Sequence, residues 1–255
     1  MACLGYVQDF PAPMDVYIAG MQDEGSTAYA VEGQILLLNG PKVSELKAGE
    51  IQRVIRPEGS IRDRGPGGAL GVYHKDIGTV RIETVGGETA TARVIMSCQG
   101  MLKGDVVTPD AAKPVIEYGG ELSSALTPIP EQGIFGSILF GKDDIREMTA
   151  GNFAFIGLGG RDGIKPGDRF TIFRPYPEFN SKETEVEGKK SRSVYSPLRN
   201  SYTFRSRLSE MLNDRSLPPK VLGDFVVLHA GNEISAGKIV NSLKEIHPGD
   251  YIVKR

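Results

Sequence analysis

The sequence predicts a mainly β protein made of two tandem small antiparallel β-barrel modules, the second with an inserted loop and a short α-helix. Three observations lead to this prediction. Glycine (32 residues) and proline (16 residues) are abundant in the 255-residue chain, and tryptophan is absent. The apolar runs are brief and rich in β-branched and aromatic residues, which favours strands over helices. Two long blocks of sequence also recur in the same order.

The first repeated block spans residues 31–57 and returns at 149–175, without gaps, at a constant offset of 118. Gly33 meets Gly151 in this alignment, and Arg56 meets Arg174, each arginine being followed by proline. Between these matched residues, positions that are apolar in one block are also apolar in the other. This agreement predicts that both blocks fold into the same pair of strands.

The second block, 76–107, aligns with 221–252 at an offset of 145, so the second copy carries 27 additional residues between its blocks. Each copy also opens with a strand-like run, at 16–20 and 137–141. We therefore expect a first module at 14–109, a linker at 110–133 and a second module at 134–255, with an insertion at 176–220. Six short antiparallel strands in each module are best stabilised by closing into a barrel, which hides the edge strands.

A Gly-acid motif precedes an apolar strand position four times, with its acids at Glu50, Asp105, Asp168 and Asp250. Glycine supplies the positive φ of a tight turn, and the carboxylate can accept hydrogen bonds from the amides of that turn. We interpret these acids as turn residues and not as metal ligands. The glycine-rich run 157–163 has the wrong spacing for a nucleotide-binding loop and leads into a strand.

The insertion combines a charged stretch, 181–193, with an amphipathic pattern at 201–216. Phe204, Leu208 and Leu212 recur at helical spacing, which predicts a short helix. Its basic residues form either a solvated face or a docking surface for an acidic partner or cell-wall polymer. The candidate partner-binding residues are Lys189, Lys190, Arg192, Arg199, Arg205 and Arg207.

The two cysteines have no metal-type or redox-type spacing, so we expect inert thiols at Cys3, in a loose tail, and at Cys98, in a strand. A Cys3–Cys98 disulfide, a metal pair and a lipid-anchored Cys3 remain alternatives. No motif for a catalytic residue, cofactor or metal is present. The net charge of −2 gives no drive toward nucleic acid, and no apolar run is long enough for a membrane span. No secretory signal is recognised at the start of the sequence.

The pattern Gly-Ile-Lys-Pro-Gly-Asp-x-Phe-x-Ile-x-Arg-Pro within 163–175, followed by Leu-Gly-x-Phe-Val-Val and a closing Pro-Gly-Asp-Tyr-Ile, resembles a known module. It is similar to the C-terminal module of the flagellar assembly protein T family. It also resembles the module that follows a LysM domain in secretin-associated envelope proteins of Gram-negative bacteria. The resemblance implies a periplasmic, non-catalytic component of rings around flagellar motors or secretin pores.

We therefore expect a non-enzymatic cell-envelope scaffold or assembly protein that acts through protein partners or self-association. A mature or trimmed chain would be periplasmic, and otherwise the chain would be cytoplasmic. The first alternative is an adaptor that binds a polysaccharide or peptide through the basic insertion. The second is an enzyme of unknown type, because scattered carboxylates cannot be paired from sequence.

Overall fold

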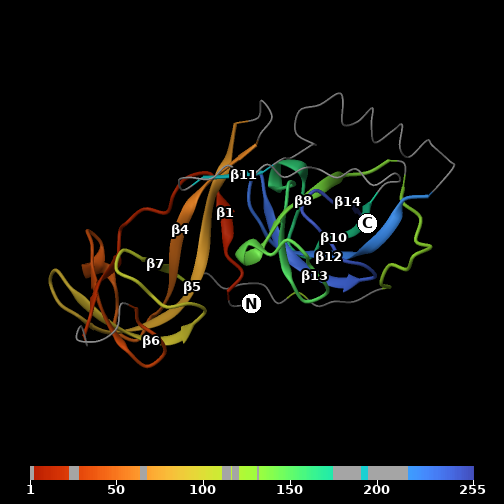
Figure 1. Cartoon of the computed structure of the whole chain (residues 1–255). Coiled ribbons are helices and arrows are strands. Elements are labelled where there is room, and N and C mark those ends of the chain that lie inside the picture. The colour runs from red at the N-terminus through yellow and green to blue at the C-terminus, as the bar shows by residue number, and fades with distance from the viewer. Residues whose placement is uncertain are drawn as a thin grey trace. The chain divides into compact units, whose positions relative to one another are not determined.

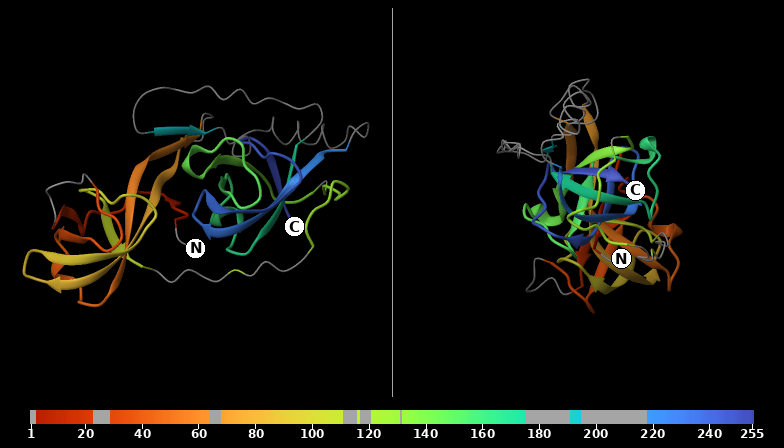
Figure 2. Two further views of the ribbon diagram at one scale, coloured as in Figure 1. Left: turned by 60° about the horizontal axis from the view of Figure 1, so that its bottom comes forward. Right: turned by 90° about the vertical axis from the view of Figure 1, so that its right-hand side faces the viewer.

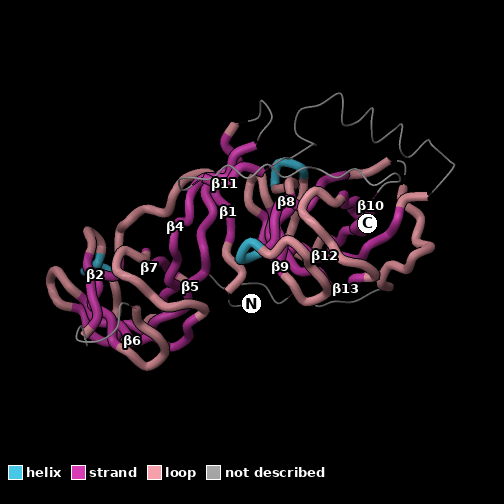
Figure 3. Tube along the Cα trace, viewed as in Figure 1, coloured by secondary structure: helices cyan, strands magenta, loops and turns pink. Residues whose placement is uncertain are grey.

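The chain is mainly β, as predicted, and it divides into two compact units (Figure 1). Unit 1 comprises Met1–Gly5, Phe10–Glu58 and Tyr73–Lys113, and unit 2 comprises Tyr6–Asp9, Gly59–Val72 and Pro114–Arg255. The computed structural model describes residues 3–22, 29–63, 68–110, 116, 121–130, 132–174, 191–194 and 218–255. Strands dominate this part of the chain, with short 3₁₀ turns between them (Figure 3).

The first barrel is a ring of six strands in the order β4-β5-β6-β3-β2-β7, closed by pairing of β7 with β4. Its strands are β2 (Tyr17–Met21), β3 (Ile35–Asn39), β4 (Ile51–Asp63), β5 (Ala69–Val85), β6 (Ala90–Ser97) and β7 (Val106–Pro109). A short 3₁₀ turn, η1 (Val43–Glu45), follows β3. Two further strands extend the sheet, β1 (Tyr6–Gln8) beside β5 and β11 (Ser191–Val194) beside β4.

The second barrel is a closed ring of six strands in the order β10-β12-β13-β9-β8-β14 (Figure 2). Its strands are β8 (Phe135–Gly141), β9 (Phe153–Ile156), β10 (Arg169–Arg174), β12 (Lys220–Ala230), β13 (Ser235–Ser242) and β14 (Tyr251–Lys254). The 3₁₀ turns η2 (Lys142–Asp144) and η3 (Gly160–Asp162) lie between strands. The strand order equals that of the first barrel once each strand is matched to its repeat.

Strand register confirms the duplication residue by residue. In β3 and β6, Leu36 lies opposite Ala92, and in β9 and β13 the equivalent Ala154 lies opposite Gly237. Both β5–β6 and β12–β13 have their β-bulges at equivalent positions, the first after Thr79 or Asp224. The opening strands β2 and β8 correspond at an offset of 120.

The barrel interiors differ by compensating changes in volume. The second barrel packs Phe225 edge-to-face against Phe170, with ring centroids 6.4 Å apart. A Cβ added to Gly237 would lie 2.4 Å from the Phe225 ring, so this core position requires glycine. In the first barrel the equivalents are Val80 and Ala92, both buried. A smaller residue on one strand thus leaves room for a larger one on the neighbouring strand.

The Gly-acid motifs are turns, as predicted. Each acid accepts a hydrogen bond from the backbone amide three residues before it, as Asp105 does from Leu102 at 2.8 Å and Asp250 from His247 at 2.7 Å. The glycine before each acid has a positive φ, 87° at Gly104. Asp105 and Asp250 also form equivalent bidentate ion pairs.

One arginine–aspartate pair fastens the last turn of each barrel to the ring. Arg56 donates from Nε and Nη2 to the two carboxylate oxygens of Asp105, at 2.7 and 2.8 Å. Arg174 binds Asp250 in the same way, at 2.7 and 2.9 Å. The hydrogen bond to Asp105 raises the pKa of Arg56 above its ordinary value. These contacts explain why the arginine and the aspartate recur in both sequence blocks.

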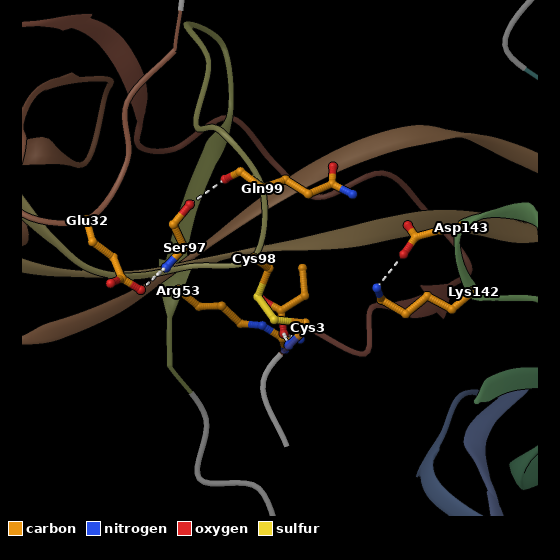
Figure 4. Close-up of a disulfide and its surroundings, with 9 residues drawn as sticks. Cys3, Glu32, Arg53, Ser97, Cys98, Gln99, Lys142 and Asp143 are labelled. Carbon is orange, nitrogen blue, oxygen red and sulfur yellow. Dashed lines mark hydrogen bonds and ion pairs between the residues drawn. A yellow bond between two sulfur atoms is a disulfide. The ribbon is translucent and has the colours of Figure 1, made fainter. Parts of the chain in front are cut away.

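The expectation of inert thiols was wrong: Cys3 and Cys98 form a disulfide across 95 residues of sequence (Figure 4). The segment around Cys3 is not loose, because its amide donates to Asp76 at 3.2 Å and the nearby Ala12 amide donates to His74 Nε2 at 2.9 Å. The disulfide also leaves no Cys3 sulfur for a lipid or a metal. No spacing of residues in the sequence predicts this disulfide, because its formation depends on how the segment around Cys3 docks on the barrel.

The basic insertion lies almost wholly outside the described residues. The predicted helix at 201–216 and its apolar residues belong to that part, as do Lys189, Lys190, Arg199, Arg205 and Arg207. Arg192 is placed only as backbone, in β11, opposite Ile61 in a parallel pairing with β4. The role assigned to these cations therefore stays a prediction.

Candidate binding site on the second barrel

A polar patch on the outer face of the second barrel follows from strand alternation. Phe170 and Ile172 point into the core, so Thr171 between them points outward. Asp224 and Asn241 lie directly opposite each other on β12 and β13, and Asp224 lies opposite Thr171 of β10. Arg255, just after β14, reaches the same place, since its Nε donates to Thr171 Oγ1 at 3.0 Å. These four side chains converge on one spot.

An extended segment, residues 121–130 and hereafter the arm, is bound at this patch. Sequence had assigned these residues to the linker 110–133. Ser123 is the anchor: its amide donates to Asp224 Oδ2 at 2.7 Å and its hydroxyl to Asp224 Oδ1 at 2.6 Å. Ser123 and Asp224 are only 4% and 5% exposed. Two charge-assisted hydrogen bonds of this kind fix both the backbone and the side chain of the bound residue.

Neighbouring side chains complete the anchor from both sides. Asn241 Nδ2 donates to the Ser123 carbonyl and to Asp224 Oδ2, each at 3.0 Å. Arg255 donates to the Glu121 carbonyl at 2.7 Å, contacts the Ser123 hydroxyl and pairs with Asp224 at 3.0 Å. The buried carboxylate is therefore neutralised and fully hydrogen-bonded, as a buried charge requires.

The far end of the arm is held by apolar contacts. Ile129 packs with Phe173, Val253 and Tyr251, an outward-facing cluster that is distinct from the barrel core. Between the two ends, a turn closed by the Thr127 amide donating to the Ser124 carbonyl leaves Leu126 92% exposed. The arm is thus fastened at two points and projects between them.

The first barrel holds its own leading segment at a related place, but by a covalent bond. Cys3 and Ser123 are related by the offset of 120 that also relates β2 and β8. Cys3 bonds to Cys98, at the end of β6, and Arg53 pairs with the nearby Asp76 at 2.7 Å. Arg53 is the equivalent of Thr171. Each copy therefore holds the segment before its first strand. The first copy does so through the Cys3–Cys98 disulfide and the second through Asp224.

A cavity of about 350 Å³ opens beside the arm on the second barrel. Leu122 of the arm forms part of its wall, and Val226 and Val240 belong to the apolar part of its lining. Three cations also line it: Arg169 at the start of β10, Lys238 on β13, and Arg255. Apolar and charged side chains therefore share the lining of this cavity.

Among the described residues, no group of three or more His, Cys, Asp or Glu side chains could hold a metal ion. In the glycine-rich run 157–163, the Gly159 amide donates to Asp162 at 2.9 Å, so a carboxylate of the run itself binds this amide. No helix in the described part of the chain is long and apolar enough to cross a membrane.

Sequence reasoning missed Ser123, Asp224, Asn241 and Arg255 as a group. Asp224 and Asn241 fall inside the second repeated block, yet the equivalent residues of the first copy are Thr79 and Met96, so the repeat alignment does not mark them. The offset of 120, which places Ser123 against Cys3, comes from the strand register, and the opening runs expected at 16–20 and 137–141 imply 121 instead.

A scan against protein-family models found no match to this chain, and searches of curated proteins and of solved structures found no similar protein either.

Proposed function

We propose that the chain is a non-enzymatic scaffold or assembly protein of the cell envelope, which acts by binding extended protein segments on the outer faces of its barrels. The observation that carries this proposal is the arm anchor. Asp224, Asn241 and Arg255 bind the arm mainly through its backbone amide, its carbonyls and one small hydroxyl. Such contacts recognise the backbone of an extended segment, because they involve its amide and carbonyl groups more than its side chains.

Duplication supports a structural role. Two copies of one module present related but unequal faces, and head-to-tail contacts between such faces close into a ring when the rotation permits. A ring around a flagellar motor or a secretin is the assembly that the sequence resemblance implies. Self-association and binding to other envelope proteins are both part of this proposal.

The disulfide supports a location outside the cytoplasm. Structural disulfides form and persist in oxidising compartments such as the bacterial periplasm, and they are rare in the cytosol. The Cys3–Cys98 bond joins segments 95 residues apart and fixes the first barrel's leading segment. The periplasm is accordingly the compartment we propose.

Electron microscopy of the purified chain, alone and mixed with the proteins encoded beside its gene, tests the function. We expect ordered assemblies with the wild type and their loss with Asp224→Ala, while circular dichroism confirms that the variant keeps its strands. Asp15→Ala, which removes an exposed ion pair with Lys42, is the control and should assemble normally. Monomers in every mixture, or substrate turnover that survives stringent purification, would overturn the proposal.

A further inference from the structure

One row of side chains on the outer face of the second barrel is largely buried. The row crosses the neighbouring strands β12, β13, β9 and β8 and consists of His229, Ala236, Phe155 and Phe140. Phe155 points away from the core, because its neighbours Ala154 and Ile156 belong to the core, yet it is fully buried. Its ring stacks on that of Phe140, with the two centroids 4.4 Å apart.

The strand β1 lies at the end of this row, within the same compact unit. The ring of Tyr6 packs on the ring of His229, with centroids 5.5 Å apart. The next residue, Val7, is buried, and its carbonyl oxygen lies so close to Gly231 that a Cβ added there would be 2.5 Å from it. The second barrel therefore binds an extended segment on its outer face, with an aromatic side chain placed on the row.

The equivalent row of the first barrel is exposed. It consists of Thr84, Thr91, Leu37 and Gly20, paired across the strands in the same order, and is hereafter the Leu37 row. Leu37 takes the place of the buried Phe155 and is 39% exposed. Gly20 takes the place of Phe140 and has no side chain to stack on it. The Leu37 row is thus open to an apolar side chain from outside.

The residue equivalent to Tyr6 is exposed as well. The offset of 120 between the leading segments matches Tyr6 to Leu126, which is 92% exposed at the tip of the arm. Two hydrogen bonds of the arm order its turn, from the Leu126 amide to Ser124 Oγ at 3.3 Å and from the Ser124 amide to Thr127 Oγ1 at 2.8 Å. A leucine presented by an ordered turn loses less conformational entropy on binding than one in a flexible chain.

We propose that Leu126 of one copy of this chain docks on the Leu37 row of a second copy, as Tyr6 docks on the His229 row within one chain. The partner follows from the duplication, because the two exposed surfaces are the equivalents of two surfaces that are in contact. The contact is heterologous, so each copy offers Leu126 to one neighbour and its Leu37 row to another, which gives a ring or a filament. The inference rests on the proposed function and adds the partner, a second copy, and the residues through which it binds.

Sedimentation equilibrium of the full chain tests this contact. The average mass of the wild type should rise above that of one chain as its concentration increases. Leu126→Asp and Leu37→Asp should each weaken this self-association more than about tenfold, since each puts a charge where an apolar side chain is buried in the contact. Leu243→Asp is the matched control, because Leu243 is 40% exposed just after β13, and it should associate as the wild type does. Circular dichroism checks that all variants keep their strands.

Mixing the two variants tests the direction of the contact. Leu37→Asp keeps an intact Leu126, and Leu126→Asp keeps an intact Leu37 row, so their mixture should form pairs that neither variant forms alone and should stop at two chains. A wild type that stays monomeric, association that both substitutions leave unchanged, or a mixture without pairs would overturn the inference. Ordered assemblies with the proteins encoded beside the gene that persist in Leu126→Asp would remove this contact and leave the scaffold function standing.

Discussion

Removal of the disulfide by a double substitution, Cys3→Ser with Cys98→Ser, should destabilise the first barrel strongly. The bond closes a loop with a sequence separation of 95 residues. For a loop of this length, the entropy that the cross-link removes from the unfolded chain is worth about 4.7 kcal/mol at 25 °C. That is a large share of the roughly 5–15 kcal/mol that stabilises a typical domain.

Urea-dependent hydrogen exchange, read by mass spectrometry, can assign the loss to one barrel. Peptides from 35–58 and 76–109 report the first barrel, and peptides from 220–254 report the second. We expect the first-barrel midpoint to fall by about 2 M urea, for a slope of about 2 kcal/mol/M, with a smaller change in the second barrel. Reduction of the wild type should reproduce this fall and have no effect on the variant. Two titratable thiols per chain in the unreduced wild type would refute the reasoning.

Three further substitutions, measured by urea unfolding, test other parts of the structure. Arg174→Met leaves a buried carboxylate unpaired and should cost about 3–5 kcal/mol, whereas Lys42→Met, at an exposed pair, should leave the midpoint unchanged. Gly237→Ala forces a Cβ to within 2.1 Å of a backbone oxygen and should cost more than about 2 kcal/mol, while Gly87→Ala, with open space around it, should be neutral. Ser123→Ala should lower stability by about 1–3 kcal/mol and expose the arm to proteolysis, and an unchanged cleavage rate would contradict its role as anchor.

Features that recur in the chain could be predicted from it. Turn glycines and apolar positions align at two constant offsets, and each aligned position carries a local physical requirement, such as a positive φ at Gly49 and Gly167. The matching sets of strands and the extra residues of the second copy followed from that alignment, and barrel closure was expected because it hides the edge strands. The order of the strands around each barrel was not predicted. The duplication could be recognised in the sequence because both copies must meet the same structural requirements at the same positions.

Contacts that occur once could not be predicted. The disulfide and the anchor of Ser123 on Asp224 join residues 95 and 101 positions apart. Neither leaves a spacing pattern, since each depends on where a non-strand segment docks on a finished barrel. Cysteine and serine at these places looked like residues of a tail and a linker. Only the three-dimensional arrangement reveals that both segments are bound.

Features that both copies share and features that only one copy has lead to different conclusions. The ion pairs Arg56–Asp105 and Arg174–Asp250 recur because each barrel must fasten its last turn to close, so they are requirements of folding. Closure does not require the Ser123 anchor or its cavity, since the first barrel closes without them. Retaining a buried charge costs stability, and apolar residues would serve closure equally well. The differences between the two outer faces are therefore the part of the molecule that folding leaves unexplained, and partner binding is the explanation we favour.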